Sequence, residues 1–293
     1  MKASVFFRIH RSSFLEVLPM YIFTLAFILG PIIYMAVLSF MRREGAWGVA
    51  AGFTLRNYFR IAEPVYLETL GQSLRLALTT TAVTVLAGYP FGYFMARLKP
   101  AWRGRIMILL IIPFWTSSLM RLYGWIIFFR ANGILDTALM ALGLTKEPLR
   151  LLYTYPAVVT GMIYALVPFM IYAVYASAEK LNWELVEAAR DLGASPFAAF
   201  YTIIFPLTMP GLFSGVVLTF IPSMGLYFIA DILGGNKVVL MGSLIQEQLM
   251  KAHDWPFAAA LGMVLMGMTT VFIWLYRRFS RRLGGGNYLE GLV

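Results

Sequence analysis

The stretch "EAARDLGASPFAAFYTIIFPLTMPG", residues 187–211, interrupts an otherwise apolar chain with charged residues at helical spacing. It begins as a polar helix, breaks at the Gly-Ala-Ser-Pro of residues 193–196, and then runs into apolar sequence. This order predicts a short helix-turn-helix that lies outside the bilayer and leads directly into a membrane span.

The first helix of this element is predicted over residues 183–192, with Asn182 as its N-cap. Its apolar residues recur at the spacing of one helix face and are Leu185, Ala188, Ala189 and Leu192. Gly193 follows at the position that favours a left-handed C-terminal cap. Ser195 and Pro196 then predict the N-cap and the first residue of a second helix.

The second helix has its own apolar face, formed by Phe197, Phe200, Tyr201 and Ile204. Pro206 and Pro210 are expected to bend the chain at the start of the following span, because each removes a backbone hydrogen bond. Periodicity alone leaves two interpretations of the whole element. It is either a lever pushed by a cytoplasmic partner or an amphipathic connector that rests on lipid headgroups.

The composition of the 293-residue chain is that of a membrane protein: 60% of residues are hydrophobic and 13% are charged. Soluble domains carry about 25% charged residues. The chain has no cysteine, and His10 and His253 have no ligand-like neighbours, so a metal site is not expected. The net charge of +10 comes from basic residues beside apolar runs, which indicates membrane orientation and not nucleic-acid binding.

Six transmembrane helices are predicted, because a hydrocarbon core of about 30 Å needs roughly 20 apolar residues. The predicted spans are 18–40, 74–96, 106–129, 157–178, 203–229 and 256–276. They predict an all-α polytopic membrane protein with a single transmembrane domain over residues 1–293. Both termini are assigned to the cytoplasm because the short 97–105 loop holds four basic residues and no acidic one. Residues 179–202 are then cytoplasmic too.

The opening stretch resembles the "EAA…G………I-x-LP" signature of the permease subunits of ATP-binding-cassette (ABC) importers. The matching residues are Glu187, Ala188, Ala189, Gly193, Ile203 and Pro206. Phe205 stands where the signature usually has Leu. The resemblance implies the type I ABC importer permease fold, with residues 183–205 as the coupling element that docks on the ATPase. The coupling residues it implies are Glu187, Ala188, Ala189, Asp191, Leu192 and Gly193.

Further stretches are similar to the permeases of spermidine/putrescine importers. They are "PFWTSSLMRLYGW" (113–125), "LTMPG" (207–211), "LGG" (233–235) and "DWPFAAA" (254–260). The resemblance extends from about Phe53 to Arg278. It implies a bacterial inner-membrane subunit with several partners: a second homologous permease, a dimer of cassette ATPases and an external solute-binding protein. A permease for another small organic solute is the alternative.

A phosphate-binding loop of the G-x-x-x-x-G-K-[ST] type is absent from the sequence. ATP and magnesium are therefore expected to bind to the partner ATPase, and this chain is expected to be a non-catalytic conduit without a cofactor of its own. The rival interpretation is a self-sufficient secondary transporter or channel. That class needs intramembrane carboxylates for ion coupling, and Asp231 at the edge of a span is the only candidate.

A conduit for a polycation should offer aromatic faces and acceptor groups, each cation–π contact contributing about 0.5–2 kcal/mol. The candidates for this path are Trp115, Tyr123, Trp125, Tyr227 and Asp231. Aromatic residues are also enriched at membrane interfaces, which is the alternative explanation for them. Asp231 is expected to have either a path role or a pairing role.

Arg121 lies inside the predicted third span, where a central arginine costs about 2.5–3.5 kcal/mol. We expect it to have a structural role and a partner, such as an acidic residue of this or the sister subunit. The pairs Gly88/Gly92 and Gly211/Gly215 are small-residue signals for close helix packing.

Overall fold

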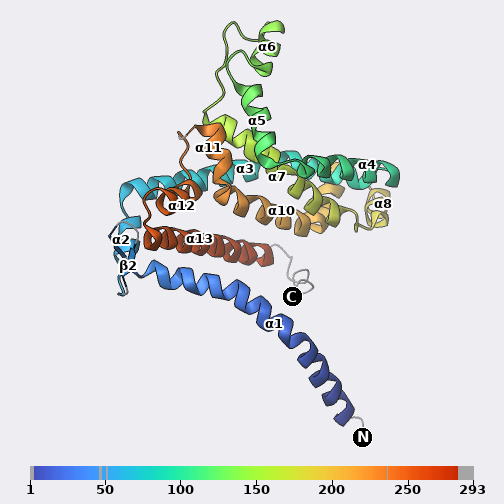
Figure 1. The fold of residues 1–293 in the computed structure, drawn as a ribbon. Coiled ribbons are helices and arrows are strands. Elements are labelled where there is room, and N and C mark those ends of the chain that lie inside the picture. Colours follow the sequence, from blue (N-terminus) through green and yellow to red (C-terminus); the bar gives the residue numbers. More distant parts are fainter. Residues whose placement is uncertain (1–2, 46–47, 51, 236, 283–293) are drawn as a thin grey trace. The chain divides into compact units, whose positions relative to one another are not determined.

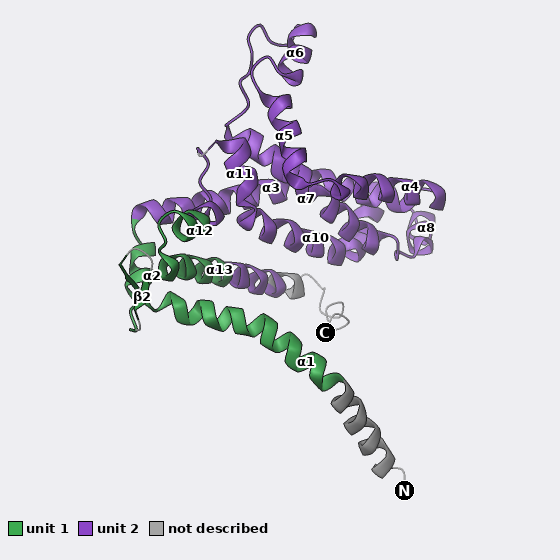
Figure 2. Ribbon diagram, in the orientation of Figure 1, with its two compact units in different colours: residues 1–63, 245–267 green, residues 64–244, 268–293 purple. Residues whose placement is uncertain are grey.

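The structure is a computed structural model that describes residues 3–45, 48–50, 52–235 and 237–282, with side chains described from Val17 to Arg278. Contacts divide the chain into two compact units (Figure 2). Unit 1 comprises residues 1–63 and 245–267, and unit 2 comprises residues 64–244 and 268–293.

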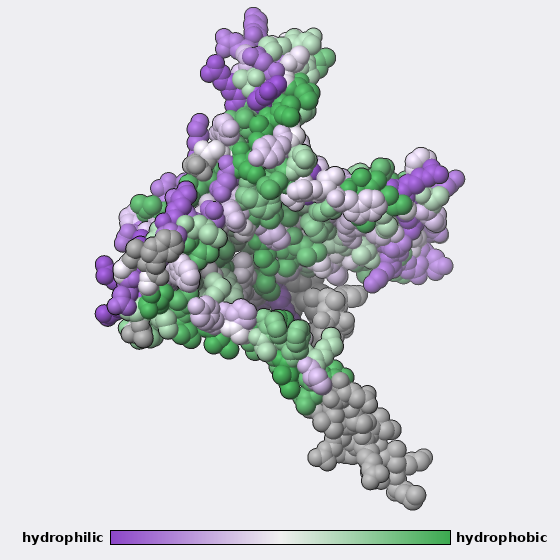
Figure 3. Space-filling view, in the orientation of Figure 1, coloured by the Kyte–Doolittle hydropathy of each residue, from purple (hydrophilic) through white to green (hydrophobic). Residues whose placement is uncertain are grey.

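Unit 1 begins with the long helix α1 (Ala3–Ser39), whose apolar part from Val17 onward is only 6% buried. Figure 3 shows that the described part of α1 presents mainly hydrophobic surface. Such a surface requires lipid or another subunit to cover it. The chain then forms an antiparallel hairpin of β1 (Arg42–Glu44) and β2 (Gly48–Ala50), followed by α2 (Arg56–Ile61). The end of α12 (Met241–Met250) and the first half of α13 (Trp255–Arg282) complete the unit.

Unit 2 is built around α7 (Tyr155–Ala178), on which α3 (Pro64–Arg97) and α10 (Phe205–Gly225) pack (Figure 1). Both predicted glycine pairs lie in these interfaces, which confirms the prediction of close packing. A Cβ atom on Gly88 would lie 2.7 Å from Met170 Cγ, and one on Gly215 would lie 2.4 Å from Met170 Sδ. Met170 of α7 is therefore held between a glycine of α3 and a glycine of α10.

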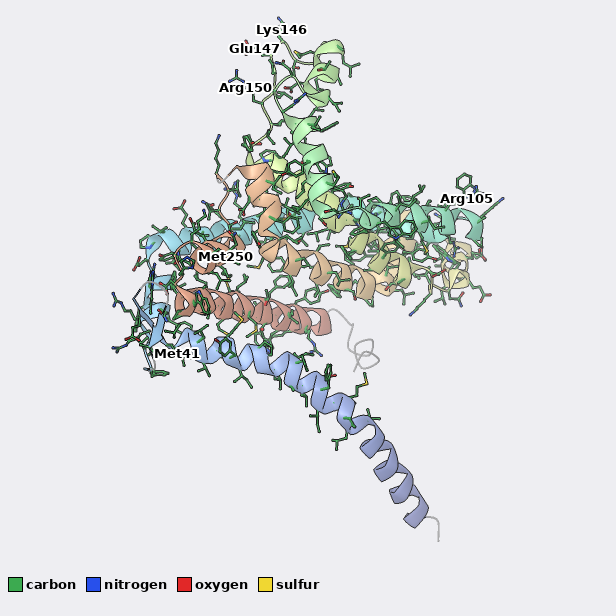
Figure 4. The ribbon with its side chains drawn as sticks, viewed as in Figure 1. Met41, Arg105, Lys146, Glu147, Arg150 and Met250 are labelled. Carbon is green, nitrogen blue, oxygen red and sulfur yellow. The ribbon has the colours of Figure 1, made fainter. Side chains whose placement is uncertain are left out.

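Shorter elements surround this core. They are α4 (Pro100–Ile111), a 3-10 turn (Ile112–Trp115), α5 (Ser118–Phe129), α6 (Ile134–Ala141), α8 (Trp183–Asp191), α9 (Pro196–Ala199), a π turn (Phe200–Ile204) and α11 (Tyr227–Gly234). Together α5 and α6 form an arm, and Figure 4 places Lys146, Glu147 and Arg150 at its tip.

Four helical segments of the described chain are long and apolar enough to cross a membrane: Val17–Ser39, Tyr155–Ala178, Pro196–Gly225 and Trp255–Arg278. A bent pair, Pro100–Trp115 with Ser118–Ala141, is a fifth candidate. Helix α3 contains the predicted second span and has 34 residues, but its threonines lower its hydropathy. The all-α multi-pass fold is confirmed, and the count of six remains a prediction that requires both the bent pair and α3 to cross.

The third predicted span, 106–129, is wrong as a single straight helix. Its two halves belong to the segments Pro100–Trp115 and Ser118–Ala141, which meet at 94°. Pro113 lies in the 3-10 turn, and Thr116 after it has an extended backbone, so the helical hydrogen bonds are interrupted. Arg121 closes this bend: its guanidinium donates to the carbonyl oxygen of Pro113 and, over 3.0 Å, to Ser118 Oγ. Within the described chain, Arg121 therefore has backbone and hydroxyl partners, and an acidic partner on the sister subunit stays a prediction.

Pro206 and Pro210 do not interrupt the helix, because Pro196–Gly225 forms one continuous helical segment. The bend predicted at these prolines stays a prediction. A π turn over Phe200–Ile204 explains the continuity. It contains Thr202, whose carbonyl lies four residues before Pro206 and would press against the proline ring in an ordinary helix. The wider turn accommodates the proline without a break. The segment ends at Gly225, so Tyr227 and Asp231 belong to α11 and not to the fifth span.

Candidate functional site

The predicted helix-turn-helix is present, and its caps are those expected from the sequence. Asn182 accepts a hydrogen bond from the backbone N–H of Glu184, and Ser195 Oγ accepts one from Ala198 N–H. Gly193 has a φ of +89°, the left-handed value that favours glycine. The turn is held by two backbone bonds, Gly193 N–H to Arg190 O and Ala194 N–H to Ala189 O, each 2.9 Å long. This is the Schellman pattern of a firmly terminated helix.

The side of α8 that packs on the rest of unit 2 is not the apolar face expected from periodicity. Trp183 and Val186 pack on a buried cluster that includes Tyr93 of α3 and Ile204 of the π turn. Leu185, by contrast, is exposed. The short helix is therefore fixed by its first turn and leaves apolar side chains unburied.

The unburied side chains form what we call the outward face of the element. It comprises Leu185 and Ala188 of α8, its C-cap Leu192, Phe197 of α9 and Tyr201 of the π turn. Leu192 is 89% exposed, and Phe197 is 71% exposed. Beside them a shallow hollow of about 380 Å³ is lined by Glu187, Arg190, Asp191, Gly193, Ala194 and Pro196. Exposed apolar residues next to a polar rim are typical of a protein-docking surface.

The inner side of α8 is joined to the end of α3. The Arg97 guanidinium lies 5.5 Å from the Trp183 ring centroid and 6.0 Å from that of Tyr93. The rings of Tyr93 and Trp183 are 6.1 Å apart. Sequence reasoning missed this cluster. The only local sign of it is the helical spacing of Trp183 and Val186. Nothing in the sequence pairs these residues with Tyr93 and Arg97.

The predicted path residues lie on the 3-10 turn, α5 and α11, and they differ in exposure. Trp115 and Tyr123 are exposed, whereas Trp125 packs in the core, its ring stacked 5.0 Å from that of Phe129. Tyr227 and Asp231 lie one turn apart on α11. Asp231 Oδ1 accepts a hydrogen bond of 2.7 Å from Ser243 Oγ. Among the described residues no group of three or more His, Asp or Glu side chains is placed to hold a metal ion.

Residues 88–285 match the family described as "Binding-protein-dependent transport system inner membrane component". The chain is 44% identical over 252 residues to the spermidine/putrescine transport system permease protein PotB of Escherichia coli K12, covering 86% of this chain and 92% of that protein. It is 39% identical over 264 residues to PotB of Haemophilus influenzae, covering 90% and 92%.

Two solved structures of a bacterial alginate ABC transporter share the fold. One matches with a TM-score of 0.68 at 16% identity, over 96% of this chain and 99% of that chain. The other, in complex with an alginate-bound periplasmic protein, matches with a TM-score of 0.73 at 15% identity, over 94% and 96%. The matched family covers the coupling element, the α7–α10 core and α13. The chain therefore belongs to the inner-membrane components of binding-protein-dependent transport systems, and it is a multi-pass protein of the inner membrane.

Proposed function

We propose that this chain is one of two permease subunits of an ATP-driven importer for polyamines such as spermidine and putrescine. The cargo is inferred from two relatives named for spermidine/putrescine transport, which are 39% and 44% identical over most of the chain. The proposed partners are a second homologous permease, a dimer of cassette ATPases that binds ATP and magnesium, and an external solute-binding protein. Both termini and the coupling element are assigned to the cytoplasm.

The observation that carries the proposal is the two-sided construction of the coupling element. Its outward face exposes Leu192 and Phe197, which no residue of the described chain covers. Its inner side is fastened to α3 through Trp183 and Arg97. The element therefore has a docking surface on one side and an attachment to α3 on the other. This arrangement allows it to transmit force from a bound partner to α3.

The transmission follows from the contacts within unit 2. Closure of the ATPase dimer pushes α8 through Glu187, Ala188, Ala189, Asp191, Leu192 and Gly193. The Schellman turn keeps α8 and α9 from folding together, and the continuous segment 196–225 passes the motion into α10. Because α3 and α10 both pack tightly on α7, the three helices move together. The translocation cavity between the two permease subunits then alternates between outward and inward access.

The polyamine path is proposed to use Trp115, Tyr123, Trp125, Tyr227 and Asp231. Aromatic faces attract ammonium groups by cation–π contacts of about 0.5–2 kcal/mol, weak enough for the cargo to leave again. Asp231 supplies the one carboxylate in this set, and its bond to Ser243 fixes the orientation of the carboxylate.

The test is co-purification of the cassette ATPase with a Leu192→Asn variant. Leu142→Asn is the matched control. Both leucines are C-caps of short helices, both precede a glycine of positive φ, and Leu142 is 73% exposed. We expect the ATPase to be lost from the Leu192 variant and retained by the control. Equal retention of the ATPase by both variants would show that the outward face does not contribute to ATPase binding.

A second arm of the experiment separates the importer from a stand-alone transporter. The purified chain is reconstituted into liposomes either alone or together with the second permease and the ATPase, and uptake of radiolabelled spermidine from the binding protein is measured. We expect uptake only when the second permease, the ATPase, ATP and the binding protein are all present. Uptake by the chain alone would establish a secondary transporter or channel instead.

A further inference from the structure

Unit 1 contains a charged pocket at the end of α1, distinct from the coupling element. The pocket has a volume of about 780 Å³, and its charged lining consists of Arg42, Arg43, Arg56, Arg60, Glu63 and Asp254. The first two arginines come from β1, and Arg56 and Arg60 come from α2. A pocket with this lining does not suit a cationic cargo, so it needs another explanation.

One pair of these charges is structural. Arg60 Nη1 lies 2.8 Å from Asp254 Oδ2, and its guanidinium lies 3.9 Å from the Phe257 ring centroid. Arg42, Arg43 and Arg56 have no ion pair with any carboxylate of the described chain. Since Arg60 and Asp254 neutralise each other, three guanidinium groups are opposed by Glu63 alone, which leaves a net charge of 3 − 1 = +2.

Hydrogen bonds hold this pocket at the depth where α1 leaves the bilayer. Asn57 Nδ2 donates to the carbonyl oxygens of Ser39 and Met41, over 2.8 and 3.0 Å, and Thr54 N–H donates to Phe40 O over 2.7 Å. The apolar segment Val17–Ser39 has 23 residues, and such a helix is about 35 Å long. The hydrocarbon core is about 30 Å thick. Arg42 and Arg43 therefore lie at the level of the lipid headgroups.

Exposed aromatic side chains accompany the charges. Phe53 and Phe59 are each 73% exposed, and Phe53 stacks on Phe40 at the end of α1 with ring centroids 5.0 Å apart. Apolar rings beside unpaired guanidinium groups fit a molecule that has an anionic group next to a hydrocarbon part. A phospholipid has this composition, whereas a carboxylate on a soluble protein surface leaves the rings uncovered.

We propose that this pocket binds the phosphate of an anionic phospholipid headgroup, with Arg42, Arg43 and Arg56 as its contacts. Arginine is suited to the role because its planar guanidinium donates two parallel hydrogen bonds to phosphate oxygens. The bound lipid would fix the outer end of α1 in the membrane. The inference goes beyond the transport function and does not depend on the identity of the cargo.

The test is native mass spectrometry of the purified full-length chain titrated with phosphatidylglycerol. The variant Arg42→Gln/Arg43→Gln/Arg56→Gln is compared with Arg130→Gln/Lys146→Gln/Arg150→Gln, which removes the same charge from exposed positions of the α5–α6 arm. We expect the first variant to bind the lipid at least about tenfold more weakly, since hydrogen bonds to charged groups are the strong ones. The control should bind like the parent chain.

Three results would overturn the proposal. The first is equal phosphatidylglycerol binding by both variants. The second is displacement of the lipid by inorganic phosphate at comparable concentration, which would make the ligand a free anion. The third is a pocket variant that keeps its lipid but loses ATPase stimulation by the binding protein in the assembled importer, which would assign the pocket to protein docking. If the triple variant does not assemble, the exposed Arg56→Gln is compared with Arg130→Gln in the same titration. The first two results do not bear on ATP-driven transport.

Discussion

The guanidinium of Arg97 lies 5.5 Å from the ring centroid of Trp183 and thereby joins the last residue of α3 to the first residue of α8. Tyr93, one turn earlier on α3, lies 6.1 Å from the same indole. The coupling element therefore has two attachments to the core of unit 2. It begins on α3 and continues, through the π turn, into α10.

Replacing Trp183 with Leu should uncouple ATP hydrolysis from transport. The cation–π contact contributes about 0.5–2 kcal/mol, so we expect uptake per ATP hydrolysed to fall by about twofold to thirtyfold. The control is Trp102→Leu, since Arg105 lies 5.1 Å from that ring but the pair belongs to α4. Uptake and hydrolysis are measured in proteoliposomes. An unchanged ratio in the Trp183 variant would show that α3 receives no force through this contact.

Replacing Gly193 with Val should reduce uptake while membrane insertion stays normal. Its φ of +89° costs a side-chain-bearing residue about 1–2 kcal/mol, and no neighbouring atom lies near the added Cβ. Gly143 has a φ of +70° and equally open surroundings, so Gly143→Val introduces the same strain outside the coupling element. Uptake is compared at equal amounts of inserted protein. Similar losses in both variants would trace the effect to strain and not to coupling.

Replacing Gly211 with Val should destabilise the core of unit 2. A Cβ at this position would lie 2.5 Å from the backbone oxygen of Ala173 and 2.5 Å from Ser177 Oγ, so α10 and α7 must separate. Overpacking of this kind costs about 1–3 kcal/mol. Gly124→Val, where no atom lies within 4 Å of the added Cβ, is the control. Thermal unfolding in detergent is the measurement, and a midpoint no lower than that of the control would contradict the predicted close packing.

Replacing Asp231 with Asn should weaken polyamine uptake if its carboxylate lines the path. Ser243→Ala is the control, because it removes the 2.7 Å hydrogen bond while leaving the negative charge in place. We expect a raised KM for uptake in the Asp231 variant and a much smaller change in the Ser243 variant. Equal effects would mean that the hydrogen bond, and not the charge, is what the protein requires.

The helix caps are the part of the candidate site that the sequence predicts best. Asn182, Gly193 and Ser195 act through their own backbone and side-chain preferences over a few residues, so neighbouring structure does not alter them. The glycine pairs of α3 and α10 were predicted for a similar reason, since only glycine permits such close helix contact.

The error in the third predicted span arises where apolar composition conceals backbone geometry. The interval 106–129 is apolar enough for one span, yet Pro113 and Thr116 break it at a place that hydropathy does not register. Pro206 follows a π turn, which lets the helix continue past the proline without a break. In both cases hydrogen-bond geometry decides, and hydropathy carries no information about it.

The sequence by itself determined that this is a multi-pass helical protein with a short capped lever in its fourth loop, because hydropathy and capping are local properties of the chain. Only the tertiary structure decided which side of the lever packs inward. Trp183 and Val186 pack on the core, whereas Leu185 and Leu192 of the periodic apolar face are exposed. The tertiary structure also decided that Arg42, Arg43 and Arg56 line one pocket. Those arrangements depend on contacts between residues distant in sequence, whose free energy exists only once the helices have packed.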